Sequence, residues 1–130
     1  MKIPGPDHPI TLEWARRRWR VRFAGEVIAD SAEAIVLREA HYPLRVYFPR
    51  ADVAMERLSR TAHTTYCPYK GDAAYYAVRI DGKVADNAVW TYEQPYPAMA
   101  AIEGMLSFYP DKVEVHEAPQ TADAAGGDAR

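Results

Sequence analysis

The sequence contains a single cysteine, Cys67, and this scarcity excludes two kinds of architecture. One thiol cannot form an intramolecular disulfide, and a metal site built from several cysteines cannot be assembled. Such low cysteine usage is typical of proteins from a reducing compartment. We therefore expect a cytoplasmic protein.

Long apolar runs and excess positive charge are also missing. The segment Met1–Pro6 lacks the apolar stretch of a secretion signal, and no run approaches the roughly 18 apolar residues of a membrane helix. Acidic residues number 18 against 16 basic ones, which gives a net charge of -2. We expect no membrane association, no nucleic-acid partner and no cofactor.

What the chain does contain is enough apolar material for one core. Its 130 residues are 48% hydrophobic, which is typical of a globular domain. Prolines at 4, 6 and 9 predict an extended arm over residues 1–13, ahead of a single β-rich domain over residues 14–117. Residues 118–130 have no apolar anchor, and we expect a disordered tail there.

Alternating side chains predict the first strand, between residues 16 and 29. One face would carry Trp19, Val21 and Phe23, and the other Arg18, Arg20 and Arg22. Short β-rich runs at 34–37 and 45–48 predict two more strands, and Asp52 can cap a short helical turn that reaches Leu58.

The strongest local signal is a hairpin over residues 73–92. Asp-Gly at 81–82 supplies the positive φ angles of a two-residue turn. That turn would pair Tyr76 with Asn87 and Ala73 with Trp90. The face likelier to lie in the core would contain Tyr76, Val78, Ile80, Ala85, Asn87 and Val89.

A helix is predicted after this hairpin, because apolar residues recur at helical spacing from Met99 to Leu106. Strands at 107–109 and 113–115, joined by a turn at Pro110–Lys112, are then predicted to form a closing strand pair. The fold class predicted is therefore mainly β (α+β), a compact antiparallel domain with one helix in its C-terminal half and one short helical turn.

Several motifs, in order along the chain, resemble the domain of unknown function 427 family. The resemblance covers roughly residues 8–117. The matching segments are Arg20–Ser31, Leu37–Glu39, Tyr47–Val53, Thr65–Gly71, Asn87–Glu93 and Phe108–Val113.

This resemblance implies a β-tent-like antiparallel fold and carries the family's nucleotidyltransferase label. The Gly-Ser and paired metal-binding aspartates of the usual nucleotidyltransferases are absent from the sequence. Other β-tent domains bind zinc through two Cys-x-x-Cys pairs. With one cysteine, we expect no metal site here.

The segment Thr65–Gly71 is predicted to be a loop, and it holds both candidate catalytic residues, Cys67 and Lys70. A cation near a thiol favours the reactive thiolate, and His63 could approach in space. A small buried apolar role is the alternative for Cys67, and a plain surface lysine is the alternative for Lys70. The order Lys-Gly excludes a P-loop.

Aromatic residues are concentrated around this loop, since seven of the fifteen lie within residues 66–96. Some should be core and others should line a concave surface. Five arginines between 16 and 22 form the one basic concentration, either a phosphate-binding face or a solvated face paired with acids. The predicted ligand-binding residues are Arg22, Arg38, Tyr66, Tyr69, Lys70, Trp90 and Tyr92.

These residues support three functional hypotheses. The first is a domain that binds a small ligand or partner at an aromatic pocket beside Tyr66–Lys70. The second is an enzyme, either thiol-dependent through Cys67 or a transferase that holds an anionic group with Lys70. The third is a protein interaction module, such as a homodimer joined through a strand edge.

Overall fold

The computed structural model describes residues 1–119, so most of the segment predicted to be a disordered tail lies outside the described residues. Ten strands and three short 3₁₀ helices make up the described part. The strands are β1 (Ile10–Trp14), β2 (Arg18–Phe23), β3 (Glu26–Ser31), β4 (Ile35–Glu39), β5 (Arg45–Phe48), β6 (Leu58–Cys67), β7 (Gly71–Ile80), β8 (Lys83–Thr91), β9 (Leu106–Phe108) and β10 (Glu114–Ala118). The helices are η1 (Arg50–Asp52), η2 (Met55–Arg57) and η3 (Pro97–Ile102).

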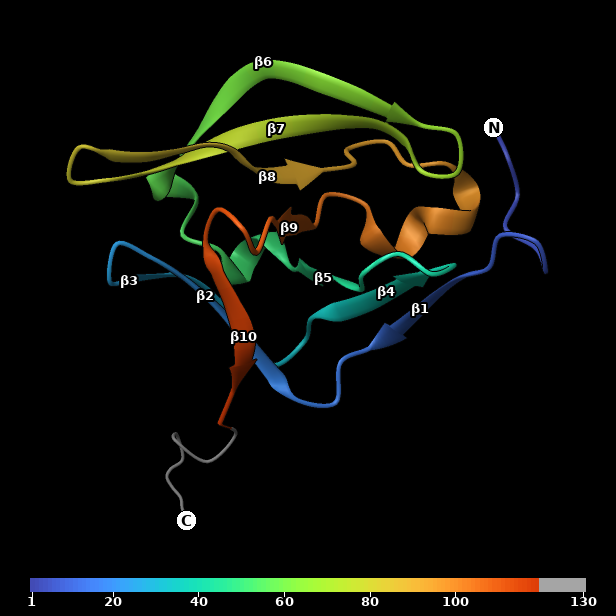
Figure 1. Ribbon diagram of the computed structural model, residues 1–130, viewed down its shortest axis with the longest axis horizontal. Coiled ribbons are helices and arrows are strands. Elements are labelled where there is room, and N and C mark those ends of the chain that lie inside the picture. Colours follow the sequence, from blue (N-terminus) through green and yellow to red (C-terminus); the bar gives the residue numbers. More distant parts are fainter. Residues whose placement is uncertain (120–130) are drawn as a thin grey trace.

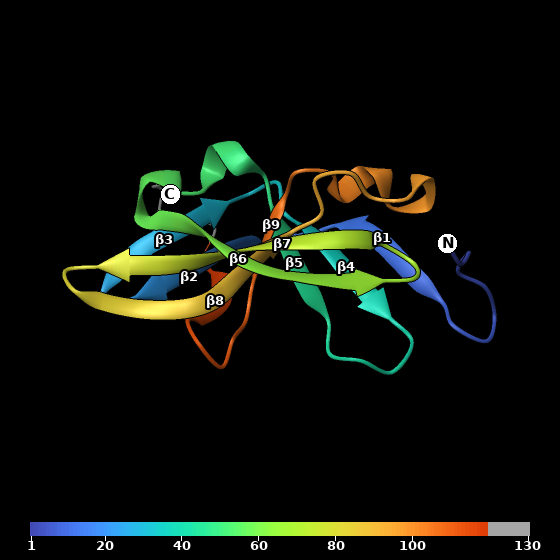
Figure 2. The ribbon, with the colours of Figure 1, turned by 90° about the horizontal axis from the view of Figure 1, so that it is seen from above.

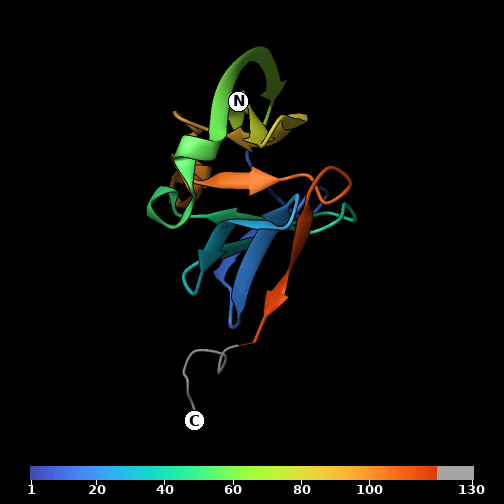
Figure 3. The ribbon, with the colours of Figure 1, turned by 90° about the vertical axis from the view of Figure 1, so that its left-hand side faces the viewer.

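The strands form two antiparallel sheets, which confirms the mainly β prediction. Seven strands follow the order β1-β4-β5-β9-β8-β7-β6, and three follow the order β10-β2-β3. Figure 1 shows β6, β7 and β8 along one side of the molecule and β1, β4 and β5 along the other, with the short β9 between them. Figure 3, turned by 90°, shows the three-stranded sheet toward the end opposite β6.

The alternation predicted for the first strand is confirmed in β2. Val21 is fully buried between the sheets, and Trp19 and Phe23 pack against the same core. The arginines of the other face pair with an acid on β3, since Arg18 and Arg20 both reach Asp30. The arginine face was expected either to bind phosphate or to pair with acids, and for Arg18 and Arg20 the structure shows pairing with an acid.

The predicted hairpin is confirmed at its turn, where Asp81 and Gly82 both have positive φ and Ile80 pairs with Lys83. The predicted register farther along is wrong. A bulge at Asn87, whose φ is +51°, shifts the pairing by two residues, so that Tyr76 pairs with Val89 and Tyr75 with Trp90. A shift of two preserves the faces of a strand, and the predicted core face is therefore buried apart from Asn87.

The helical predictions differ from the structure in length. The helix expected from Met99 to Leu106 is only the 3₁₀ helix η3, which ends at Ile102. Met99 has non-helical backbone angles, Gly104 has a positive φ, and Leu106 already pairs in β9. In place of the single turn expected from Asp52 to Leu58 there are two 3₁₀ turns, η1 and η2, and Asp52 ends the first of them instead of capping a helix, because its carboxylate accepts a hydrogen bond from Ser31.

Three further segments differ from the sequence predictions. The strand pair expected over 107–115 is not formed, because β9 pairs with β5 and β8 in the large sheet whereas β10 pairs with β2 in the small one. The loop expected over 65–71 is a tight turn at 68–70, because its first residues continue β6 and Gly71 begins β7. The last residues of the predicted extended arm form β1, which pairs with β4. No helix of the described residues is long and apolar enough to cross a membrane.

The seven-stranded sheet separates two clusters of buried side chains. The first core lies between the two sheets, and its buried hydrophobic members are aliphatic side chains, two phenylalanines and Tyr76. The second cluster lies on the other face and is richer in aromatic rings. Its buried members are Ile35, Leu37, Tyr47, Ala73, Tyr75, Trp90, Tyr92, Met99, Ile102 and Met105.

Candidate functional site

The candidate site is built on a row of side chains that crosses the middle of the large sheet. Tyr47 on β5 lies opposite Ser107 on β9, and Ser107 in turn lies opposite Trp90 on β8. Residues directly opposite each other in antiparallel strands share a face of the sheet. The small Ser107 side chain therefore leaves room for the two large rings, which meet edge to face with centroids 6.2 Å apart.

Trp90 is fixed in this row by a hydrogen bond. Its Nε1 donates to the hydroxyl of Tyr47 at 3.1 Å, and both side chains are buried. Burial raises the pKa of Tyr47 above its ordinary value, since the charged phenolate is disfavoured away from water. This pair forms a rigid aromatic floor.

A cavity of about 220 Å³ lies over this floor. The loop between β4 and β5 contributes to its walls, as does the residue that follows β9; Figure 2 shows the β4–β5 and β9–β10 loops on the same side of the molecule. Five of the lining residues are tyrosine and one is tryptophan. The cavity is lined by Leu37, Glu39, Tyr42, Pro43, Arg45, Tyr47, Lys70, Tyr75, Trp90, Tyr92 and Tyr109.

Arg45 contacts two aromatic rings in the wall of this cavity, and these rings also contact each other, with centroids 4.4 Å apart. Its Cζ lies 5.3 Å from the centroid of Trp90 and 5.5 Å from that of Tyr109. Both distances are within the range of a cation–π contact. Within residues 1–119 the guanidinium has no hydrogen bond and no ion pair. Its N–H donors are therefore available to a molecule in the cavity.

Glu39, at the end of β4, differs from Arg45 in that its charged group has hydrogen-bond partners within the protein. Lys70 donates to Oε1 of Glu39 at 2.5 Å, and Nε2 of His8 lies 2.7 Å from Oε2. Burial alone raises the pKa of Glu39, but the hydrogen bonds and charges of Lys70 and His8 outweigh it and leave the pKa below its ordinary value. Glu39 is therefore a carboxylate at neutral pH with both oxygens occupied.

The remaining tyrosines supply hydroxyl groups. Tyr75 shares hydrogen bonds with Thr65 at 3.0 Å and with Tyr109 at 3.4 Å. Burial raises the pKa of Tyr109 to about 12. Tyr92 is 7% exposed, yet within the described residues its hydroxyl has no hydrogen-bond partner and still reaches solvent. Burial raises its pKa, so this hydroxyl is a protonated donor at neutral pH.

Comparison with known proteins gives one family. Residues 11–118 match the profile described as a domain of unknown function, DUF427. The chain belongs to this family. The match confirms the resemblance drawn from the sequence motifs and covers all the cavity residues. None of the curated proteins matches the chain in a sequence comparison.

In this DUF427 domain, three of the predicted ligand-binding residues line the cavity: Lys70, Trp90 and Tyr92. Two others do not line it. Tyr69 stacks on His8 with centroids 4.2 Å apart, and Tyr66 is 56% exposed and bonds to the hydroxyl of Tyr96. The aromatic concentration in the sequence thus supplies only part of the cavity lining.

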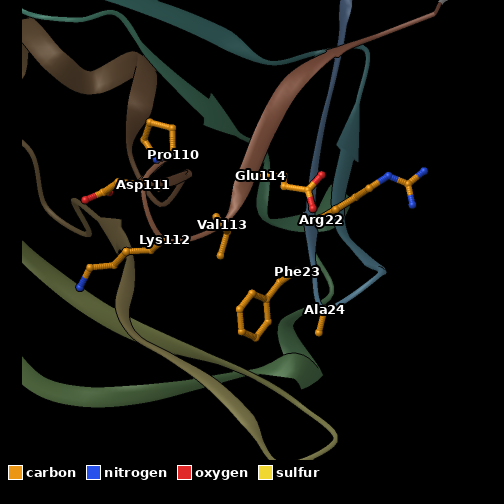
Figure 4. Close-up of a pocket in the computed structure, with 8 residues that line it drawn as sticks. All are labelled: Arg22, Phe23, Ala24, Pro110, Asp111, Lys112, Val113 and Glu114. Carbon is orange, nitrogen blue, oxygen red and sulfur yellow. The ribbon is translucent and has the colours of Figure 1, made fainter.

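The two predicted arginines lie elsewhere in the DUF427 domain. Arg38 is exposed and lines a separate hollow beside Trp14. Arg22 lines a shallow hollow at the start of β10, drawn in Figure 4. There its guanidinium points away from Lys112, whose ammonium extends to the opposite side. The structure therefore does not bring these arginines to the aromatic cavity.

The predicted catalytic pair does come together. The Nζ of Lys70 lies 3.8 Å from Sγ of Cys67, and Cys67 is partly buried against the second cluster. His63 instead packs on the ring of Tyr75, with centroids 4.5 Å apart. Across residues 1–119, no three His, Cys, Asp or Glu side chains group closely enough to hold a metal ion.

Sequence reasoning missed five of the residues that line the cavity: Glu39, Arg45, Tyr47, Tyr75 and Tyr109. They lie on β4, β5, β7 and after β9, and pairing between distant strands brings them together. One signal was available. Arg45 and Tyr47 alternate with the apolar Val46 and Phe48, which places both on the face away from the first core.

Proposed function

We propose that this domain binds a small organic molecule in the cavity lined by Glu39, Arg45, Lys70, Trp90 and Tyr92. The carrying observation is a concave aromatic surface in which two polar groups have no partner among the described residues. Ligand sites in proteins commonly combine aromatic walls with a few placed polar groups. The aromatic walls would contact the body of the ligand and the polar groups would orient it.

The state of the polar groups supports this function. Most buried polar groups in folded proteins have a hydrogen-bond partner. Tyr47, Tyr75 and Glu39 follow that rule, whereas the guanidinium of Arg45 and the hydroxyl of Tyr92 do not. A bound molecule would satisfy both, in place of the water that reaches them in the empty cavity.

The three tryptophans allow a direct test by NMR. Trp90 lines the cavity, whereas Trp14 is 68% exposed and Trp19 lies on β2. We expect small ring compounds to shift the indole N–H resonance of Trp90 and to leave that of Trp14 unchanged. A Trp90→Phe variant assigns the signal. A compound set that moves only the Trp14 resonance, or no indole resonance, would contradict ligand binding in this cavity.

A thiol-dependent enzyme is the second candidate, and the contact between Cys67 and Lys70 favours it. The Nζ of Lys70 lies 3.8 Å from the Sγ of Cys67, and reactive cysteines in enzymes commonly lie beside a cationic side chain. If this candidate holds, iodoacetamide will alkylate Cys67 faster in the folded protein than in the unfolded protein. Lys70→Met would remove that advantage. A folded protein that reacts more slowly than the unfolded chain would exclude thiol catalysis. A transferase would use the same Lys70 to hold an anionic group.

A further inference from the structure

We infer that the cavity selects a small aromatic carboxylate, one ring carrying one negative charge, with the carboxylate bound to Arg45. The inference rests on the proposed function, because it names the class of molecule that the cavity takes. It is carried by three independent features of the site: its net charge, the orientation of Arg45 and its volume.

The charges that line the cavity leave one positive charge uncompensated. Among residues 1–119 the charged lining side chains are Glu39, Arg45 and Lys70. Glu39 and Lys70 neutralise each other through their hydrogen bond, and the charge of Arg45 remains. A ligand with one negative charge would bring the cavity to neutrality. A neutral or cationic ligand would leave the guanidinium charge uncompensated in a partly buried site.

The contacts of Arg45 with the two rings leave its N–H donors free to bind a ligand. Trp90 and Tyr109 lie within cation–π distance of Cζ, and the guanidinium makes no hydrogen bond or ion pair within residues 1–119. The N–H donors lie in the plane of the guanidinium and form a fork that fits a carboxylate with two parallel hydrogen bonds. The two rings therefore hold Arg45 in place while its donors stay available.

The Glu39 end of the cavity argues against a second anionic group. Glu39 is a carboxylate whose oxygens already accept from Lys70 and His8. Lys70 is thus occupied and is not a free anion partner. A ligand with two negative charges would place one of them near Glu39, and like charges repel strongly where water is scarce. The hydroxyl of Tyr92 offers a neutral donor instead.

The volume fits one ring. A cavity of about 150 Å³ in an engineered protein accepts benzene. The present cavity of about 220 Å³ exceeds that by the room needed for a small substituent. It is smaller than the roughly 300–1,000 Å³ of sites for drug-sized molecules. A single substituted ring fills it, with aromatic neighbours on several sides.

Matched probes test the charge preference in the wild-type protein. Benzoate, benzamide and benzylamine share one ring and differ in charge. Titrations followed by the Trp90 indole resonance should show benzoate binding at least about tenfold more tightly than benzamide, because its hydrogen bonds to arginine are charge-assisted. Phthalate, with two carboxylates, should bind more weakly than benzoate. Equal binding of benzoate and benzamide, or preferred binding of benzylamine, would overturn the inference.

Variants of Arg45 locate the selectivity. In Arg45→Gln the preference for benzoate over benzamide should vanish, while benzamide still binds and so reports an intact cavity. Arg45→Lys should retain part of the preference. Arg38→Gln is the control, because Arg38 is an exposed arginine on the neighbouring strand β4 that lines a different hollow.

The outcomes distinguish a failure of ligand binding in the cavity from a failure of the carboxylate preference alone. If none of the three ring compounds moves the Trp90 resonance, the proposed binding function fails and the inference fails with it. If all three bind without regard to charge, the binding function stands and the inference alone is wrong. Selectivity that survives in Arg45→Gln, or that disappears in Arg38→Gln, would also refute the assignment to Arg45.

Discussion

The two faces of the seven-stranded sheet use the same strands for different purposes. On one face, Val46, Phe48 and Val89 pack against the three-stranded sheet in a closed core. On the other face, the alternate residues Tyr47 and Trp90 carry polar atoms and border an open cavity. One strand of alternating side chains thus contributes to the core between the sheets on one side and to the lining of the cavity on the other.

The comparison shows how polar groups are tolerated in a small domain. The face of the first core carries few polar side chains; one of them, Thr91 opposite Leu106, is buried and its hydroxyl has no hydrogen-bond partner among residues 1–119. In the second cluster, every deeply placed hydroxyl or charge is either paired inside the protein, like Tyr47 and Glu39, or opens to the cavity, like Tyr92. The polar groups left open on the second face are therefore those that we propose contact a ligand.

The largest effect on stability should come from a substitution on the closed face, the face of the large sheet that packs against the three-stranded sheet. Phe48 is fully buried and packs edge to face on Phe108. Phe48→Ala should lower the free energy of unfolding by about 3–5 kcal/mol, measured by urea denaturation, because it leaves a cavity in a packed core. Tyr42→Ala is the matched change on the open face. Tyr42 is 54% exposed, and its loss should cost no more than about 0.5 kcal/mol. Similar costs for the two variants would refute the contrast.

A slightly smaller loss of stability should follow from breaking the ion pair between Lys70 and Glu39 on the open face, the face that borders the cavity. The side chains of Lys70 and Glu39 are only 9% and 13% exposed. Lys70→Met should cost about 3 kcal/mol at pH 7, since it leaves a largely buried carboxylate with His8 alone. The double variant Lys70→Met, Glu39→Leu should recover most of that loss. A double variant as unstable as the single one would mean that packing, and not charge, makes Lys70 important.

The same pair predicts how stability depends on pH. The pKa of Glu39 is lowered in the folded protein from an ordinary value of 4.5, so its contribution is present above pH 4.5 and is lost as pH falls through the folded pKa. In Lys70→Met the carboxylate lacks its main cation, and protonation should relieve it. The stability difference between wild type and Lys70→Met should therefore shrink between pH 7 and pH 4, as followed by thermal unfolding. A constant difference would contradict this account.

The smallest effects on stability are expected for two tyrosines of the open face, Tyr47 and Tyr92, and they should differ between the two. Tyr47→Phe removes the acceptor of the Trp90 indole and should cost about 1–3 kcal/mol in stability. Tyr92→Phe removes a hydroxyl without a protein partner and should change stability by less than about 0.5 kcal/mol, while it weakens ligand binding. Thermal unfolding and benzoate titration of both variants give the comparison. A destabilised Tyr92→Phe would show that its hydroxyl is structural.

Local signals in the sequence predicted local structure well. Asp81-Gly82 fixed the turn of the β7–β8 hairpin, and alternation identified the buried face of β2. The bulge at Asn87 was not predictable, because it depends on tertiary contacts such as the hydrogen bond from Thr61 to the Asn87 side chain. The helix after Tyr96 was overestimated, since Leu106 is required as a partner of Phe48 in the sheet.

The site was predictable only where its residues are close in the chain. Lys70, Trp90 and Tyr92 were found from the aromatic concentration around one turn and one hairpin. Arg45 and Tyr109 were not, because their positions follow from the order β5-β9-β8, which joins strands far apart in sequence. Nothing in the sequence near Arg45 indicates which ring it will contact.

The three-residue strand β9 affects the order in which the strands of the large sheet pair during folding. It is the only link between β5 and β8 in the described sheet, and it lies near the end of the family segment. Because long-range pairing must close large loops, the two halves of the sheet should join late and slowly. During synthesis, the hairpins can form as they emerge from the ribosome. The cavity becomes complete only when Tyr109 has been made, so a ligand would bind the finished domain and not its nascent precursor.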